Sequence, residues 1–335
     1  MTIITIHNLT KTFITTEKQP GLKGSFRALF KPERKEIHAV KGITFNVEEG
    51  ERLAFIGPNG AGKSTTIKML VGILHPTHGE ARVLGHVPWR ERQELAYKIG
   101  AVFGQKSQLW YHLPPADSFD LLARIYELEL AAYRERLAYL VDLFELDEYL
   151  HVPVRKLSLG QRMRCEIAAS LLHRPQILFL DEPTIGLDVV VKQRIRDLIL
   201  ELNQREGATI FLTSHDAGDV EILCRRAMVI NYGDIIYDGR VTDLKHNYLR
   251  TKTISLKLGS PWEGFDARGV RTLKHKGYGV KLEVDTDVIP IETVMAQLLA
   301  RHTIVDINVD NPPMEHIIAR IYEQAAAPRT RESAA

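Results

Sequence analysis

A short apolar run that leads directly into a glycine-rich turn constrains this chain more than any other feature. Residues 52–56 have the composition of a buried strand, residues 57–64 read GPNGAGKS, and a helical pattern follows at residues 65–72. Other apolar runs that we predict to be strands are residues 3–6, 43–47, 99–103, 177–180 and 208–213. Long helical patterns at residues 118–149 and 190–205 alternate with the later runs. We therefore predict an α/β fold, in which helices cover a parallel sheet.

The composition excludes several classes of protein. Hydrophobic residues make up 44% of the 335 residues and charged residues 26%, as in a globular chain rather than a disordered or membrane-embedded one. A net charge of only +2 argues against a chain that coats nucleic acid. The only cysteines, Cys165 and Cys224, are too few for a disulfide framework or a metal cluster, and we predict buried free thiols. We expect a soluble, cytoplasmic protein, because no run of about 18 apolar residues occurs and residues 1–11 alternate like a strand rather than a signal peptide.

The order of the elements changes near residue 248. We predict an α/β domain over residues 1–247, with a Lys/Arg-rich insertion at residues 14–37 and a helical subdomain at about residues 106–172. The elements expected beyond it are strands at 253–258, 270–274, 280–284 and 304–309 and helices at 291–301 and 314–324. This order predicts a small α+β domain over residues 248–324 and suggests a ferredoxin-like sandwich. Residues 325–335 are small and polar, and we expect them to be disordered.

The glycine-rich turn carries the first chemistry. It fits the pattern G-x-x-x-x-G-K-[ST], whose glycines let backbone N–H groups surround phosphate oxygens at the start of a helix. Lys63, expected to be an exposed loop cation, would reach the β- and γ-phosphates, and the Ser64 hydroxyl would ligate Mg²⁺. The residues that we predict to hold the nucleotide here are Gly57, Pro58, Asn59, Gly60, Ala61, Gly62, Lys63, Ser64 and Thr65.

An acidic pair follows another predicted strand. Asp181 and Glu182 come directly after the apolar residues 177–180, at the edge of the sheet where open α/β folds bind ligands. Asp181 would hold Mg²⁺ directly or through water, and Glu182 would orient and polarise the attacking water. The pair therefore predicts hydrolysis of a bound nucleotide.

The sequence LSLGQ at residues 157–161 precedes this strand and resembles LSGGQ, the signature of the ATP-binding subunits of ABC transporters. The resemblance covers about residues 1–245, because the phosphate loop, a glutamine after a strand, the signature, the acidic strand, a D-loop and a histidine occur in the family's order. It implies a P-loop ABC ATPase head with a helical subdomain, an ATPase that uses ATP and Mg²⁺.

The resemblance also implies roles for residues that no local pattern singles out. Phe13 matches the aromatic residue that stacks on adenine. Gln105 matches the glutamine that senses Mg²⁺ and the permease, and His215 matches the histidine that contacts the γ-phosphate. Residues expected to complete the nucleotide site are Ser158, Gly160 and Gln161 of the signature and Asp188 of the D-loop.

The signature departs from the common pattern at one position. Leu159 stands where the family has glycine, but Ser158 and Gly160, the pair expected to touch the γ-phosphate held by a second subunit, are present. A leucine with negative φ offers the same backbone N–H, so we expect activity to survive. In this family two subunits enclose two ATP molecules, which implies a dimer, with a homodimer expected.

The type of ABC protein is indicated by the spacing of the motifs and by the amino-acid sequence of three segments. Gln105 and Ser158 are only 53 residues apart, which leaves no room for the long coiled coils of chromosome and DNA-repair ATPases. The sequence PTIGLD at residues 183–188 and the small C-terminal domain resemble the ATPases of ABC-2 type exporters, and residues 21–34 and 104–110 resemble a viologen-exporter-like bacterial branch. That branch implies separately encoded permeases, in some cases two different ones, and a location at the inner face of the membrane, without nucleic acid. The alternatives are a mechanochemical ATPase not tied to transport and an importer ATPase.

Two segments allow more than one interpretation. Trp110, Tyr111 and His112 either pack in the core of the helical subdomain or form a groove for a cytoplasmic helix of the permease. Residues 22–30 form a short basic amphipathic pattern. This pattern either packs on its own domain or docks on the permease or the anionic membrane surface.

Overall fold

The fold is described from a computed structural model of the 335-residue chain. The structure describes residues 1–16, 34–104, 106–214, 216–248, 251–310, 317–318 and 321–322. It divides into two compact units, unit 1 over Met1–Asp238 and unit 2 over Gly239–Ala335. The domain boundary predicted after residue 247 lies nine residues beyond this division. No described helix is long and apolar enough to cross a membrane.

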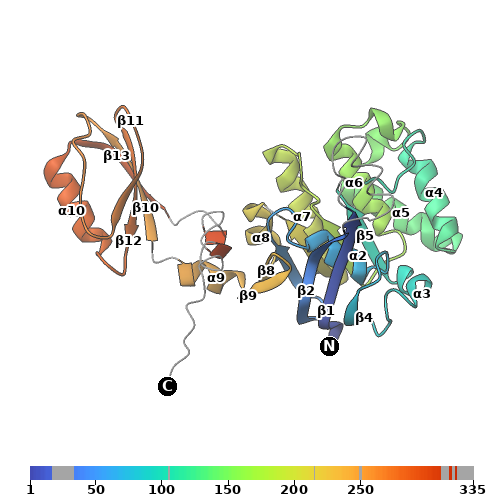
Figure 1. Cartoon of the computed structure of the whole chain (residues 1–335). Helices are drawn as coiled ribbons and strands as arrows, with labels where there is room; N and C mark the ends of the chain where they lie inside the picture. Colours follow the sequence, from blue (N-terminus) through green and yellow to red (C-terminus); the bar gives the residue numbers. More distant parts are fainter. Residues whose placement is uncertain are drawn as a thin grey trace, which may run out of the picture. The chain divides into compact units, whose positions relative to one another are not determined.

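A six-stranded sheet forms the centre of unit 1 (Figure 1). Its strands, in spatial order, are β5 (Ile99–Phe103), β6 (Ile177–Asp181), β7 (Thr209–Ser214), β3 (Arg52–Ile56), β8 (Arg226–Asn231) and β9 (Asp234–Arg240). The four adjacent pairs from β5 to β8 are parallel. Every residue of β7 and residues 177–180 of β6 are buried, as expected for strands covered on both faces. The predicted α/β fold with a parallel sheet is confirmed.

Helices connect these strands. In chain order they are α2 (Lys63–Leu70), α3 (Arg92–Ala96), α4 (Pro115–Ile125), α5 (Leu130–Phe144), α6 (Leu159–Ser170), α7 (Val189–Glu206) and α8 (Ala217–Leu223), with 3-10 turns η1 (Asp147–Tyr149) and η2 (Val154–Lys156). The single helical stretch predicted at 118–149 is wrong, because Glu127 has φ 53° and ends α4. Glu129 then caps α5 by accepting hydrogen bonds from the N–H groups of Ala131 and Ala132.

A second, antiparallel sheet of three strands has the order β2-β1-β4, with β1 at Thr2–Thr16, β2 at Arg34–Glu48 and β4 at His78–Val83. The predicted insertion at residues 14–37 was too long at both ends, because β1 continues to Thr16 and β2 begins at Arg34. Phe13 pairs with Ile37, and Ile14 pairs with Glu36, so the ladder continues past the expected ends of the strands. The amphipathic pattern at residues 22–30 lies outside the described residues.

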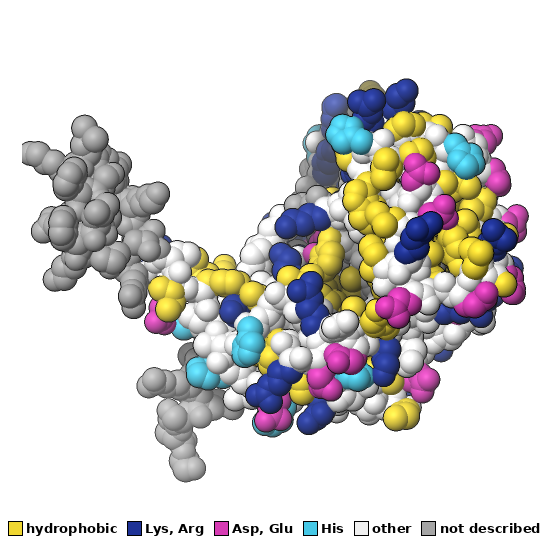
Figure 2. Space-filling model, turned by 90° about the vertical axis from the view of Figure 1, so that its right-hand side faces the viewer, with side chains coloured by type: hydrophobic (Ala, Val, Ile, Leu, Met, Phe, Trp, Pro, Cys, Tyr) yellow, Lys and Arg dark blue, Asp and Glu magenta, His cyan; other side chains and the backbone are white. Residues whose placement is uncertain are grey.

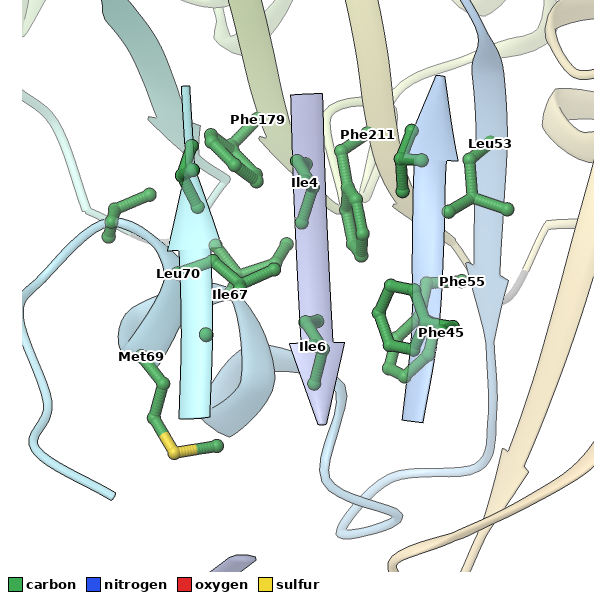
Figure 3. Packing of buried hydrophobic residues seen from close by; sticks show 14 of the residues in the cluster. Ile4, Ile6, Phe45, Leu53, Phe55, Ile67, Met69, Leu70, Phe179 and Phe211 are labelled. Atoms are coloured by element: carbon green, nitrogen blue, oxygen red, sulfur yellow. The ribbon is translucent and has the colours of Figure 1, made fainter. Parts of the chain in front are cut away.

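The core of unit 1 lies between the two sheets and α2 (Figure 3). Aromatic rings from three strands link the sheets: the ring centroids of Phe45 and Phe55 are 5.9 Å apart, and those of Phe55 and Phe211 are 5.7 Å apart. Ile67 and Leu70 of α2 join the same cluster and are fully buried. This packing fixes α2, and with it the phosphate loop, on the sheet.

Unit 2 contains α9 (Val241–Tyr248), a four-stranded antiparallel sheet and α10 (Ile291–Arg301). The sheet has the order β11-β12-β10-β13, with β10 at Thr251–Leu258, β11 at Val270–Lys276, β12 at Gly279–Asp285 and β13 at Ile304–Asp310. This is the strand order of a ferredoxin-like split motif, with α10 in the second crossover and no helix in the first, at residues 259–269. Of the helix predicted at 314–324, the structure describes only residues 317–318 and 321–322, which are helical.

The two cysteines are free and buried, as predicted. Burial raises the pKa of the Cys165 thiol to about 12, and it raises the pKa of the Cys224 thiol as well. Both thiols are therefore neutral and unreactive near pH 7.

Candidate functional site

The glycine-rich turn joins β3 to α2 and leaves no space for side chains at two of its glycines. A Cβ atom at Gly57 would lie 2.6 Å from the carbonyl oxygen of Ile230, and one at Gly62 would lie 2.4 Å from that of Ala39. Gly62 also has φ 112° and forms the N-cap of α2 without a side-chain cap hydrogen bond. The turn therefore brings the open N-terminus of a helix to the edge of the sheet, where it can bind an anion.

Lys63 is buried rather than exposed, with 6% of its surface accessible. Its Nζ donates hydrogen bonds to the carbonyl oxygens of Gly57 (2.6 Å) and Pro58 (3.4 Å), because the loop wraps around the ammonium group. Nζ also lies 3.5 Å from Oε1 of Glu182. The expectation of an exposed loop cation was wrong, and removal of Lys63 would leave a partly buried carboxylate without this ion pair.

The acidic pair ends β6 next to the phosphate loop. Oδ1 of Asp181 accepts hydrogen bonds from the hydroxyl groups of Ser64 (3.1 Å) and Thr213 (2.6 Å). Glu182 has φ 57°, a left-handed conformation that is uncommon outside glycine, and its N–H donates to the carbonyl oxygen of Thr213. Two motifs that are 117 residues apart in the sequence therefore meet at one edge of the sheet, as predicted.

A cavity of about 410 Å³ opens at this edge. The predicted residues that line it are Pro58, Asn59, Gly60, Gly62, Lys63, Ser64, Thr65, Asp181 and Glu182. The lining residues that sequence reasoning missed are Lys68, Phe103, Gly104, Lys106 and Ile185. A nucleotide's phosphates would meet loop amides, lysine ammonium groups and two carboxylates here, which is the chemistry that phosphate transfer to water requires.

Gly104, one of the missed residues, has no space for a side chain. Its N–H donates to the carbonyl oxygen of Asp181 (2.9 Å), and a Cβ atom at this position would lie 2.5 Å from the carbonyl oxygen of Glu182. A glycine after a buried strand was the only available signal in the sequence. Gln105 and His215, predicted to act beside it, lie outside the described residues.

The signature forms the N-terminus of α6 as a complete capping box. Oγ of Ser158 accepts a hydrogen bond from the N–H of Gln161 (3.2 Å), and Oε1 of Gln161 accepts one from the N–H of Ser158 (2.9 Å). Gly160 is required, because a Cβ atom there would lie 2.6 Å from Cγ1 of Val191. Leu159 lies beside Gly186, so the residue that departs from the family pattern packs on this chain's own D-loop.

The D-loop leads into α7, whose N-cap is Asp188. Oδ1 of Asp188 accepts a hydrogen bond from the N–H of Val191 (2.9 Å). A buried network holds the other end of the loop. Oδ2 of Asp219 accepts from the Thr184 hydroxyl (2.5 Å), and Oδ1 accepts from Nε of Arg196 (2.7 Å). Sequence reasoning missed this network, which fixes the D-loop on the segment that follows β7.

The remaining predicted residues lie on the surface. Phe13 is 36% exposed, and Nζ of Lys11 lies 5.2 Å from its ring centroid. Trp110 and Tyr111 are 38% and 54% exposed, and His112 is exposed as well. The interpretation that this triplet packs in the core of the helical subdomain was therefore wrong.

Comparison with known proteins agrees with this geometry. The family described as "ABC transporter" matches residues 40–185. The linearmycin resistance ATP-binding protein LnrL of Bacillus subtilis is 32% identical over 291 residues, which cover 84% of this chain and 93% of LnrL. A fluoroquinolones export ATP-binding protein of Mycobacterium tuberculosis is 37% identical over 207 residues, or 62% of this chain and 67% of that protein.

A solved structure shares the fold as well. The dimeric post-hydrolysis state of the ATP-binding cassette MJ0796, bound to ADP and Pi, has a TM-score of 0.59 and 26% identity. The match covers 71% of this chain and 98% of the cassette. The matches cover most of the length of these relatives, and the phosphate loop, the acidic strand and the signature are all in place. The chain therefore belongs to the ATP-binding subunits of ABC transporters and is an ATP-hydrolysing enzyme.

Proposed function

We propose that this chain powers the export of a substrate through separately encoded membrane permease subunits. The observation that carries the proposal is the cavity in which the phosphate loop and the acidic pair meet, in a chain whose relatives include resistance and export ATP-binding proteins. The amino-acid sequences of residues 21–34 and 104–110 support the viologen-exporter-like branch, in which the permease consists of two different polypeptides.

Oxygen atoms of Ser64 in α2 and of Asp181 at the end of β6 fit a magnesium ion. The Ser64 hydroxyl and the Asp181 carboxylate lie 3.1 Å apart, and both are the hard oxygen ligands that Mg²⁺ prefers. Within the described part of the chain no group of three or more His, Cys, Asp or Glu residues could hold a metal by itself, so phosphate oxygens would complete the coordination. When bound, the ion neutralises charge on the transferred phosphate.

The chain's own residues do the rest. Lys63 and the loop amides bind the β- and γ-phosphates, and Glu182 accepts a proton from the attacking water. Gln105 and His215 lie outside the residues that the structure describes. In this proposal Gln105 contacts the ion and His215 contacts the γ-phosphate. Phe13 stacks on the adenine ring.

A second nucleotide-binding subunit completes the site. Ser158 and Gly160 of one subunit contact the γ-phosphate held by the other, Gln161 positions the Ser158 hydroxyl through the capping box, and Asp188 lies between the two subunits. Val189 and Val190 directly after Asp188 support such an interface, because they are 80% and 79% exposed in the single chain. The same chain in two copies is the simplest arrangement.

The permease docks on the helical subdomain and holds the chain at the inner face of the membrane. Figure 2 looks onto the side of unit 1 that carries α3, α4 and α5, and it shows hydrophobic side chains gathered there. Exposed large hydrophobic residues of this region are Tyr97, Trp110, Tyr111, Leu113, Leu121, Ile125 and Leu130. Such a patch suits an amphipathic helix of a partner.

Co-expression with any membrane proteins of several predicted spans that are encoded next to this chain's gene tests the proposal. We expect the chain to co-purify with an integral membrane protein, and ATP hydrolysis in reconstituted vesicles to drive export of a test drug. A Trp110→Ala, Tyr111→Ala variant should lose co-purification and keep the hydrolysis rate of the isolated subunit. Co-purification with a solute-binding protein would indicate an importer, and the absence of any membrane partner would contradict a role in transport.

A further inference from the structure

The chain leaves the nucleotide cavity through residues 106–113, which we call the exit segment. Lys106 lines the cavity, whereas Trp110 and Tyr111 are exposed on the helical subdomain. The exit segment is therefore one continuous piece of chain with one end at the nucleotide and the other at the surface. A structure that holds this segment firmly can carry a displacement from one end to the other.

Glu166 of α6 holds the middle of the exit segment. Its carboxylate accepts hydrogen bonds from the Ser107 hydroxyl and from the N–H of Gln108 (3.0 Å). The Gln108 side-chain amide in turn donates to the main-chain oxygen of Glu166 (2.7 Å). Three hydrogen bonds therefore join two consecutive residues of the exit segment to one residue of α6, the helix whose N-cap is Ser158.

The far end of the exit segment is attached to η2, the turn that precedes the same helix. The carbonyl oxygen of Tyr111 accepts a hydrogen bond from the N–H of Arg155 (3.0 Å), and that of Leu113 accepts one from the N–H of Val154 (3.0 Å). Both donors belong to η2, which ends one residue before the signature. Exit segment, η2 and α6 are thus connected at two places, so the exposed aromatic residues and Ser158 are expected to move together.

The position of Glu166 is unusual for a carboxylate. It is 4% exposed, and its neighbours on α6, Cys165 and Ile167, are completely buried. Burial raises the pKa of Glu166, while the hydrogen bonds from Ser107 and Gln108 favour the charged form. An apolar residue of similar volume could fill this position in the core, but it could not accept these hydrogen bonds. The hydrogen bonds to the exit segment are what a carboxylate adds.

We propose that Glu166 is a positioning residue that couples the exit segment to the signature helix, so that a displacement at Trp110 moves Ser158 and nucleotide binding moves Trp110. This inference rests on the proposed function in one respect, namely that the partner which contacts and displaces Trp110 is the permease. The coupling within the chain belongs to the isolated subunit and can be measured without a permease.

Trp110 itself reports the coupling. Replacing the other two tryptophans, Trp89 and Trp262, by phenylalanine leaves Trp110 as the only one. In this background we expect ATP to change the emission of Trp110. Glu166→Met, which keeps the volume but not the acceptor, should abolish at least three quarters of that change. Affinity for a fluorescent ATP analogue, which is measured separately, should stay within about two-fold.

Matched variants separate coupling from folding. Glu166→Gln keeps one oxygen that can accept from the N–H of Gln108, and its amide can donate to the Ser107 hydroxyl, so this variant should retain most of the emission change. Glu145→Gln alters an exposed carboxylate that pairs with Arg164 and should behave as the unmodified background. If Glu166→Met does not fold, Ser107→Ala serves in its place and should lose part of the change. A full emission change in Glu166→Met, or in Ser107→Ala when it serves, would overturn the proposal, as would an emission of Trp110 that never responds to ATP.

Discussion

Two helices of unit 1 start at glycine-containing motifs, but their N-termini are built differently. The N-cap of α2 is Gly62, which provides no side-chain cap hydrogen bond. The N-cap of α6 is Ser158, which forms a full capping box with Gln161. The first end leaves main-chain N–H groups available for a ligand, whereas the second satisfies one of its own donors and protects the main chain at Ser158.

The difference in capping indicates how the N-terminus of α2 and that of α6 can each bind an anion. A phosphate can satisfy the unpaired N–H donors at the open end of α2, so we infer that this end binds the nucleotide. At the capped end of α6 the N–H groups of Ser158 and Gln161 are already paired within the capping box. Its Ser158 hydroxyl accepts from Gln161 and can still donate its own proton, so it suits an added contact to a phosphate held elsewhere. Variants at the two ends should therefore fail in different ways.

The largest effect is expected at the open end. Lys63→Ala should lower ATP affinity or hydrolysis at least 100-fold, because it removes the ammonium group beside the phosphate-binding amides. It should also destabilise the fold by about 2 kcal/mol, since the ion pair between Lys63 and Glu182 is lost and the carbonyl oxygens of Gly57 and Pro58 lose the Lys63 donor. Calorimetric titration with ATP and thermal unfolding measure the two effects.

A surface lysine provides the control for this variant. Lys41 pairs with Asp234 at 3.6 Å and is exposed, so Lys41→Ala should change neither quantity appreciably. Adding Glu182→Gln to Lys63→Ala should restore part of the lost stability. Unchanged ATP affinity and hydrolysis in Lys63→Ala would mean that the open end is not the binding site.

The second largest effect is expected at the acidic pair. Glu182→Gln should slow hydrolysis by about 10²- to 10⁴-fold, because an amide cannot accept the proton of the attacking water. ATP affinity should be retained, since the phosphate loop is unchanged. The trapped γ-phosphate should then hold two subunits together through their capped ends. Size-exclusion chromatography with ATP and Mg²⁺ should show a dimer, and a monomer under these conditions would argue against the contribution of α6.

The local patterns of the sequence predict the open end well and the capped end only in part. Residues 52–56 and 99–103 form strands with the predicted boundaries, because buried parallel strands are short apolar runs. The meeting of Ser64 with Asp181 follows from the parallel order of their strands. The burial of Lys63 could not be predicted, since it depends on how the loop carbonyls fold around the ammonium group.

Other features depend on contacts between distant segments. The edge strand β4 contains mostly polar, exposed residues and therefore lacks an apolar pattern. The network of Asp219 with Thr184 and Arg196 joins segments that are 35 and 23 residues apart in the sequence. Neither carboxylate nor guanidinium differs in the sequence from a surface residue, so only the fold reveals that they are buried together.

A smaller effect is expected from the cap itself. Ser158→Ala should cost about 1 kcal/mol of stability, which corresponds to a fall of about 2–4 °C in Tm for a domain of this size. Gln161→Ala removes the other half of the capping box and serves as the control. If the Ser158 hydroxyl also contacts a phosphate, Ser158→Ala should lower the hydrolysis rate more than Gln161→Ala does. Equal hydrolysis rates in Ser158→Ala and Gln161→Ala would mean that the Ser158 hydroxyl only caps the helix and does not contact a phosphate.

The smallest effect is expected at Leu159, the residue that departs from the family's glycine. It is the first residue of α6 and has a negative φ, so its N–H points in the same direction as that of a glycine. Leu159→Gly should therefore keep the hydrolysis rate within about two-fold, and lower stability by at most about 1 kcal/mol through the helix propensity of glycine. Leu159→Ala, which lacks that penalty, separates the loss of propensity from the loss of the contact with Gly186. A rate that rises ten-fold in both variants would mean that Leu159 restrains the D-loop, and that the capped end is held by more than its capping box.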